Sequence, residues 1–171
     1  MTRVDAYVSL GANLGDRAAR LARALEALDE LPGTRVAALS PIFETEPVGP
    51  PPQGPYLNAV ARLRTALEPR ALLERLLAIE AAAGRLRGAE RNAARSLDLD
   101  LLLHGERVVD EPGLRVPHPR LAERGFVLEP LAALAPALRH PELGATIAEL
   151  AERVRDPRAV RRWGGALDHG C

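Results

Sequence analysis

Hydrophobic and polar residues alternate with a period of two in several separate segments of the chain. This pattern predicts strands over residues 4–10, 56–63 and 97–103, because alternating side chains point to opposite faces of a sheet. Residues 36–43 have the same character but contain Ser40-Pro41. A proline cannot donate a hydrogen bond to a neighbouring strand, so we expect an edge or bent strand there.

Two amphipathic helices are predicted between these strands. In the first, hydrophobic residues recur at helical spacing, namely Leu21, Leu25, Leu28 and Leu31. Asp16 is placed to be its N-cap and Pro32-Gly33 ends it. Glu68-Pro69 opens the second helix, which ends near Gly84. The turn at residues 11–16 has two interpretations, a plain strand-to-helix connection or a phosphate-binding helix start, and the local pattern favours the first.

The predicted order is strand, helix, strand, strand, helix, strand, followed by short elements. This order is typical of a ferredoxin-like α+β sandwich, in which two helices cover one face of an antiparallel sheet. We expect residues 1–155 to form a single catalytic domain. Residues 156–171 are rich in Arg and Gly, so we expect a flexible C-terminal tail.

Composition excludes several classes of protein. With 47% hydrophobic residues and no net charge, the chain has no overall field that favours nucleic acid. No apolar run approaches the roughly 20 residues of a membrane span, and no signal peptide is apparent. The single cysteine, Cys171, fits a reducing cytoplasm. We expect a cytoplasmic monomer that binds neither nucleic acid nor membranes.

Asp98 and Asp100 are the most unusual feature of the predicted strands. They alternate with Leu97, Leu99 and Leu101, so both carboxylates lie on one face, about 6–7 Å apart along the strand. Aspartate is depleted in strands, and neighbouring like charges repel. Divalent cations held between these carboxylates and a polyphosphate would explain the pair. The alternative is a solvent-facing strand whose acids only keep it soluble.

Two predicted loops are further candidates for ligand binding. Residues 84–95 contain four arginines, Arg85, Arg87, Arg91 and Arg95, just before the aspartates. Arginine binds phosphate through a bidentate fork, so the segment is a candidate phosphate clamp, although a solvated charged loop is the alternative. Residues 45–55 are rich in Pro and Gly, and their composition fits a binding loop and a plain connector equally well.

Several motifs in this order and spacing resemble one known family. They are Pro47-Val48-Gly49-Pro50 followed by Tyr56-Leu57-Asn58, Gly84-Arg85-Leu86-Arg87, Arg95-Ser96-Leu97-Asp98-Leu99-Asp100-Leu101, Val116-Pro117-His118 and Arg124-Gly125-Phe126. The chain resembles 6-hydroxymethyl-7,8-dihydropterin pyrophosphokinase of folate biosynthesis from about residue 4 to about residue 150.

The resemblance implies transfer of pyrophosphate from ATP to the hydroxymethyl group of the pterin, with release of AMP. It implies that Asp98 and Asp100 hold two magnesium ions and act in catalysis with Arg85 and Arg95. The pterin contacts that it implies are Thr45, Val48, Tyr56, Asn58 and Phe126. The nucleotide contacts that it implies are Glu80, Arg87, Arg95, His118 and Arg124.

The chain departs from the family pattern at three places. Asn92 stands where the family often has tryptophan, which removes an aromatic contact over the pterin. Ala93-Ala94 replaces Gly-Pro, which alters how the arginine segment bends. Glu46 stands where a second loop proline often occurs. Two alternatives remain open, namely another two-metal phosphoryl or nucleotidyl transferase and a non-catalytic ligand-binding module.

Overall fold

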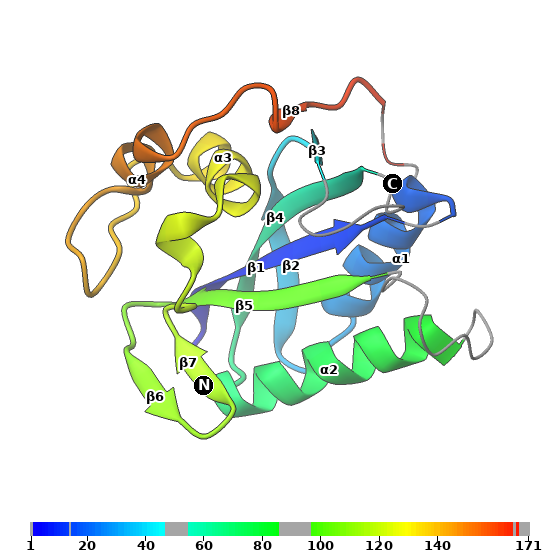
Figure 1. Ribbon diagram of the computed structural model, residues 1–171. Helices are drawn as coiled ribbons and strands as arrows, with labels where there is room; N and C mark the ends of the chain where they lie inside the picture. The colour runs from blue at the N-terminus through cyan, green and yellow to red at the C-terminus, as the bar shows by residue number, and fades with distance from the viewer. Residues whose placement is uncertain (1, 14, 47–54, 86–96, 166, 168–171) are drawn as a thin grey trace.

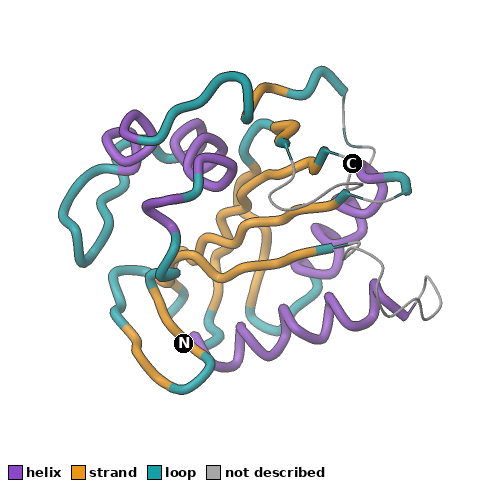
Figure 2. The backbone as a smooth tube through the Cα atoms, in the orientation of Figure 1, coloured by secondary structure: helices purple, strands orange, loops and turns teal. Residues whose placement is uncertain are grey.

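The structure is a computed structural model that describes residues 2–13, 15–46, 55–85, 97–165 and 167 (Figures 1 and 2). Its strands are β1 (Val4–Ala12), β2 (Thr34–Leu39), β3 (Phe43–Thr45), β4 (Tyr56–Thr65), β5 (Asp98–His104), β6 (Val109–Glu111), β7 (Leu114–Val116) and β8 (Val160–Arg162). Its helices are α1 (Arg17–Asp29), α2 (Pro69–Arg85), the 3-10 turn η1 (Leu121–Glu123), α3 (Gly125–Leu134) and α4 (Ile147–Arg153).

The central sheet is antiparallel, which confirms the predicted α+β fold with an antiparallel sheet. Its strand order is β5-β1-β4-β3-β8, and β2 also pairs with β4. The predicted strand at 36–43 is divided into β2 and β3, because Pro41 interrupts the pairing as expected. At this break, the Ser40 N–H donates to the Val60 carbonyl and the Ser40 hydroxyl accepts from the Val60 N–H.

The first helix begins as the sequence predicts. The Asp16 carboxylate accepts a hydrogen bond from the Ala19 N–H at 3.0 Å and so caps the N-terminus of α1. Gly33, just after the helix, has a φ of 59°, a conformation that a glycine adopts without steric cost. The second helix begins at Pro69, in agreement with the prediction.

The two predicted helices, α1 and α2, cover one face of the sheet as expected, and the short C-terminal elements cover the other face (Figure 1). On one face, α1 and α2 pack on the alternating residues of β1 and β5, among them Val8, Leu10 and Leu99. On the other face, η1, α3 and α4 pack on Tyr7 and Leu102. The short C-terminal elements therefore form a second helical layer, because they carry enough apolar side chains to bury that face.

The segment expected to be a C-terminal tail contains a short strand at residues 160–162. These residues form β8, which pairs with β3 and extends the sheet (Figure 1). The backbone of Trp163 continues the contact, since its N–H donates to the Ile42 carbonyl at 3.0 Å. The structural unit therefore includes Arg162, and the division of the chain at residue 155 does not separate a folded domain from a wholly flexible tail.

Within the described residues, none of the helices combines the length and the apolar character needed to cross a bilayer.

Candidate functional site

The two aspartates share one face of β5, as the alternation predicts. Leu97, Leu99 and Leu101 are each at most 5% exposed and pack against the core under α1 and α2. Asp98 and Asp100 are partly exposed on the opposite face. The burial of the leucines fixes the register of the strand, because a shift by one residue would bury both carboxylates and expose the leucines.

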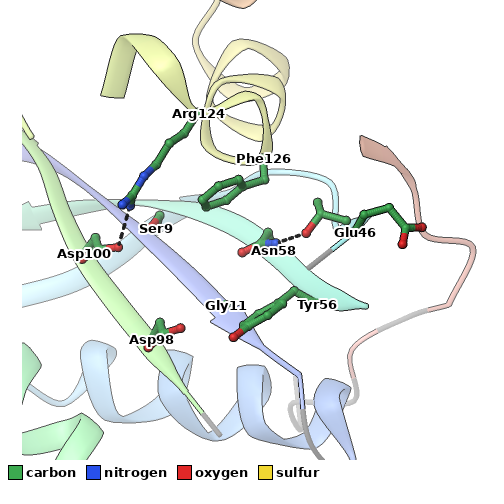
Figure 3. Close-up of a pocket in the computed structure, with 10 residues that line it drawn as sticks. Ser9, Gly11, Glu46, Tyr56, Asn58, Asp98, Asp100, Arg124 and Phe126 are labelled. Atoms are coloured by element: carbon green, nitrogen blue, oxygen red, sulfur yellow. Dashed lines mark hydrogen bonds and ion pairs between the residues drawn. The ribbon is translucent and has the colours of Figure 1, made fainter. Parts of the chain in front are cut away.

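A cavity of about 190 Å³ lies on this face of the sheet (Figure 3). Its lining consists of Ser9, Gly11, Thr45, Glu46, Tyr56, Asn58, Asp98, Asp100, Arg124 and Phe126. The structure thus brings together seven residues that the sequence predicts for the site. It adds Ser9, which no motif identified, and Gly11, which the sequence analysis placed in the turn after the first strand but which lies within β1. Their alternation on β1 places both on this face. It also adds Glu46, which the sequence marked only as a departure from the family pattern.

The strand register explains how these residues meet. Gly11 of β1 pairs with Asn58 of β4 on one side and with Asp98 of β5 on the other. Ser9 pairs in the same way with Asp100. Residues directly opposite each other in antiparallel strands share a face, so the amide and both carboxylates point toward the same space.

Asn58 has a fixed side-chain orientation. It is buried, and its Nδ2 donates a hydrogen bond of 2.6 Å to the Thr45 hydroxyl. Thr45 is buried as well and belongs to β3, which pairs with the start of β4. Because the amide nitrogen is engaged by Thr45, the Asn58 oxygen remains directed toward Gly11, where it is able to accept hydrogen bonds from a ligand.

Gly11 provides the space that this amide needs. A Cβ atom at this position would lie 2.7 Å from Asn58 Oδ1 and 3.6 Å from Tyr56 Cδ2. The first distance is too short for a non-bonded contact, so any other residue would displace the amide. The strand itself does not require a glycine here, since Gly11 does not have a positive φ.

Two aromatic rings line the cavity from different elements. Tyr56 comes from the start of β4 and Phe126 from the first turn of α3. Figure 3 shows the rings on either side of Asn58. The guanidinium of Arg124 lies 5.5 Å from the centroid of the Phe126 ring, a cation–π distance. A flat aromatic ligand would therefore find ring faces together with the polar edge of an amide.

Asp100 lies between two basic side chains. Its Oδ2 is 3.8 Å from Arg124 Nη1, and its Oδ1 is 3.9 Å from His118 Nε2. Both distances exceed those of hydrogen bonds, so these contacts are loose electrostatic ones. The carboxylate is 40% exposed, which keeps its oxygens accessible from the cavity.

His118 has a defined tautomer. Its Nδ1 accepts a hydrogen bond of 3.1 Å from the Arg120 N–H, so the proton of the neutral ring is on Nε2, the nitrogen that faces Asp100. Burial lowers the pKa of the His118 imidazole, and this effect outweighs the opposing attraction of Asp100. A neutral ring with an Nε2–H is suited to donate a hydrogen bond to an anionic ligand.

A second cavity of about 450 Å³ adjoins the first at Asp100. It lies between α2, β5 and the β6–β7 hairpin, and its polar lining includes Glu80, Asp100, Glu111, Arg115 and His118. Glu80 has a structural contact there, because its carboxylate accepts a hydrogen bond of 2.6 Å from the Leu99 N–H. The predicted nucleotide-side residues Glu80 and His118 thus line a separate, larger space, whereas Arg124 lines the first.

Some predicted residues lie outside the described part of the chain. These are Val48, Arg87 and Arg95, together with the departure at Asn92-Ala93-Ala94. Arg85 is the last residue of α2, and its side chain is not among those described. The predicted roles of these residues therefore stay predictions.

The aspartates fit a magnesium site completed by a ligand. Among the described residues, no group of three or more carboxylate, imidazole or thiol side chains forms a cluster suited to a metal ion. Magnesium is commonly held by one or two carboxylates, with phosphate oxygens and water completing its shell. Asp98 and Asp100 provide such a pair at a cavity whose neighbouring space has basic side chains.

Comparisons with known proteins decide the family. The model of the 7,8-dihydro-6-hydroxymethylpterin-pyrophosphokinase (HPPK) family matches residues 7–136. The chain belongs to the HPPK family. This confirms the resemblance drawn from the motifs. A Pseudomonas aeruginosa protein named 2-amino-4-hydroxy-6-hydroxymethyldihydropteridine pyrophosphokinase is 48% identical over 136 residues, covering 80% of this chain and 83% of that protein. A Methylorubrum extorquens protein of the same name is 43% identical over 162 residues, covering 95% and 99%.

Solved structures of the HPPK family share the fold. The HPPK-DHPS protein of Plasmodium falciparum, a triple mutant with pteroate, matches with a TM-score of 0.75 over 94% of this chain at 14% identity. The chain spans 47% of that longer protein. At this identity the likeness concerns the architecture alone.

The Gly11 geometry generates a first prediction. Gly11→Ala is expected to lower the free energy of unfolding by about 1–3 kcal/mol, because the new methyl group overpacks against Asn58. It is also expected to break the hydrogen bond between Asn58 and Thr45. Chemical denaturation measures the first effect, and the side-chain amide resonances of Asn58 report the second.

Gly84→Ala is the matched control for this substitution. Among the described residues, and apart from its own helix, Gly84 has no neighbour within 4 Å of an added Cβ. Because Gly84 lies in α2, Gly84→Ala should stabilise the fold by about 0.5–1 kcal/mol. Equal effects of the two substitutions would contradict the packing argument.

Proposed function

We propose that this chain transfers the terminal pyrophosphate of ATP to the hydroxymethyl group of 6-hydroxymethyl-7,8-dihydropterin and releases AMP, a reaction of folate biosynthesis. One observation carries the proposal. A small cavity with two aromatic rings and an oriented amide meets a larger cavity at Asp100, so an acceptor and a polyphosphate donor have adjoining spaces. Membership of the HPPK family and the names of its relatives support the same reaction.

The smaller cavity is assigned to the pterin. Its volume of about 190 Å³ is below the roughly 300–1,000 Å³ of a site for a drug-sized ligand, which suits a compact bicyclic ring. Tyr56 and Phe126 would contact the ring faces. The Asn58 oxygen would accept hydrogen bonds from the amino-pyrimidine edge, while Thr45 keeps the amide in that orientation. We further assign Val48 to this site from the family resemblance.

The larger cavity is assigned to the nucleotide. Glu80 and His118 line it, and the His118 Nε2–H is available to donate to a phosphate oxygen. Arg124 extends from the start of α3 to Asp100, at the junction of the two spaces, where its charge would contact the polyphosphate. Arg85, Arg87 and Arg95 are assigned as further phosphate ligands from the resemblance alone.

Asp98 and Asp100 are assigned as ligands of two magnesium ions. Bound there with the polyphosphate, these ions would neutralise its charge and lower the pKa of the attacking hydroxyl. The fit rests on the donor set, since two carboxylates at a phosphate site match the preference of magnesium for oxygen ligands completed by substrate.

The reaction is an in-line displacement at the β-phosphorus. A bond forms between the pterin hydroxyl oxygen and the β-phosphorus, the bond to the bridging oxygen of the α-phosphate breaks, and the hydroxyl proton is lost to solvent. The side chains of this chain contribute position and charge. Tyr56, Asn58 and Phe126 hold the acceptor. Arg124 offsets the negative charge on the donor, and the neutral His118 ring donates a hydrogen bond to it.

We also propose a cytoplasmic monomer that uses ATP and the pterin as its substrates and binds neither nucleic acid nor membranes. The single cysteine fits a reducing compartment, and zero net charge gives no general attraction for polyanions.

Product analysis tests the reaction. With ATP, magnesium and the hydroxymethyl-dihydropterin, the protein is expected to form AMP and the pterin pyrophosphate in equal amounts, because the β- and γ-phosphates move as one unit. Phosphorus NMR or chromatography measures both products. Formation of ADP or free pyrophosphate would indicate another phosphoryl or nucleotidyl transferase, and binding without turnover would indicate a non-catalytic module.

Replacement of the aspartates tests the metal assignment. Asp98→Asn and Asp100→Asn are each expected to lower kcat by about 10³-fold or more, since the charge that holds magnesium is removed with little change in shape. Asp5→Asn is the control, because the exposure of its carboxylate, 42%, is close to the 40% of Asp100, and because it also lies beside an arginine, Arg64. A loss below tenfold at both site residues would refute the assignment.

Replacement of Phe126 tests the stacking role. Phe126→Ala is expected to weaken pterin binding by about five- to thirtyfold, because a ring contact of about 1–2 kcal/mol is lost. Phe126→Trp should retain most of the affinity. Affinity for an ATP analogue should stay within about twofold in both variants. Titration calorimetry measures both ligands, and an equal loss of the two would argue against stacking on the pterin.

A further inference from the structure

The pterin side of the site depends on a very short strand. β3 has only three residues, and it carries Thr45, the partner of the Asn58 amide. Its pairing with β4 places Phe43 opposite Asn58 and Thr45 opposite Tyr56. A strand this short is held weakly by its own ladder, so its position requires support from its other edge.

The C-terminal strand β8 supplies that support. It pairs with β3 along the whole strand, with Thr45 opposite Val160 and Phe43 opposite Arg162. The Glu46 N–H continues the ladder by donating to the Ala159 carbonyl at 2.9 Å. Figure 1 shows β8 lying along β3 at this side of the sheet.

Arg161 of β8 connects the two acidic residues that flank Thr45. Its Nη2 lies 3.3 Å from Glu44 Oε1, and its Nη1 lies 3.2 Å from Glu46 Oε1. Figure 3 shows the Glu46 side chain directed away from Asn58. Without Arg161, Glu44 and Glu46 would place like charges on either side of Thr45 with less compensation.

The same network reaches the aromatic side of the cavity. Glu44 also accepts a hydrogen bond of 2.8 Å from Arg17 Nη1. This nitrogen of Arg17 donates in turn to the carbonyl of Pro55 at 2.9 Å, and Pro55 directly precedes Tyr56. The network therefore runs from β8 through β3 and the start of α1 to Pro55, the residue directly before β4.

We propose that β8, through Arg161, is a positioning element for the pterin cavity that holds Thr45 and Tyr56 in place from outside it. Among the described residues, the Arg161 side chain bonds to Glu44, Glu46 and the Arg158 carbonyl, none of which lines the nucleotide cavity, so we expect it to act on one substrate and not on the other. The inference rests on the assignment of the smaller cavity to the pterin.

Substitutions at Arg161 in the full-length chain test the proposal. Arg161→Ala is expected to weaken pterin binding by about three- to tenfold, because the ion pairs that hold Glu44 and Glu46 on either side of Thr45 are lost. Arg161→Lys keeps the charge and should stay within about twofold of the wild type. Arg161→Pro removes a backbone donor from β8 and should weaken pterin binding by at least about tenfold.

Affinity for a non-hydrolysable ATP analogue is the internal reference and should stay within about twofold of wild type in these variants. In kinetics, the KM for the pterin should rise more than kcat falls. Arg155→Ala is the matched control, because Arg155 precedes β8, is exposed to 44% against 45% for Arg161, and also joins two carboxylates, Glu129 and Glu152. This control should leave both affinities unchanged.

The outcomes separate the two claims. A wild-type protein that does not bind the pterin would overturn the proposed function and this inference with it. A wild-type protein that binds the pterin, with Arg161→Ala within twofold of it, would overturn the inference alone. Equal loss of pterin and ATP-analogue binding would also overturn it, since that pattern reports general destabilisation. Because surface ion pairs contribute little to global stability, Arg161→Ala remains decisive if Arg161→Pro does not fold.

Discussion

The register of β1 against β4 and β5 determines the geometry of the whole site. It places Gly11 between Asn58 and Asp98 in one row across the sheet, and Ser9 beside Asp100 in the next. The burial of Leu10 and Leu99 on the opposite face sets this register. A shift of one residue would move these leucines to the functional face and the polar residues of the site into the core. The alternation of side chains along β1 and β5 therefore determines both which residues enter the hydrophobic core and which residues line the site. Gly11 is the point where they constrain each other most, since a side chain there would occupy the space of the Asn58 amide.

Charge is arranged around Asp100, where the two cavities meet. Arg124, which lies between η1 and α3, and His118, which lies in the turn before η1, both approach this carboxylate. Both contacts are longer than hydrogen bonds. The positive charge of Arg124 and the polar Nε2–H of His118 stabilise the carboxylate, while its oxygens stay available for a cation. Such an arrangement suits a site for magnesium and a polyphosphate. The Asp100 carboxylate and the Arg124 guanidinium partly neutralise each other before the substrates bind, and both are already in position.

Much of this arrangement could be predicted from the sequence, and the failures have clear causes. The period of two around Leu97, Asp98 and Leu99 defines a strand and its faces, and Asp16 defines a helix start, because both signals are local. The second helical layer and β8 were not predicted, since the pairing of Val160 with Thr45 joins residues far apart in the sequence. Nothing in the immediate neighbourhood of Arg161 indicates that it would meet Glu44 and Glu46. The role of Gly11 was missed for the same reason, as it depends on the neighbouring strand.

The central claim is that one face of the sheet holds the acceptor against the Asn58 amide while Asp98 and Asp100 hold the metal ions of the donor. A crystal structure of the protein with magnesium, a non-hydrolysable ATP analogue and the hydroxymethyl-dihydropterin tests it most directly. We predict magnesium density bound by both aspartates, the pterin between Tyr56 and Phe126 with its polar edge on Asn58, and its hydroxymethyl group directed at the β-phosphate. A pterin bound elsewhere, or metal ions coordinated without either aspartate, would contradict the account.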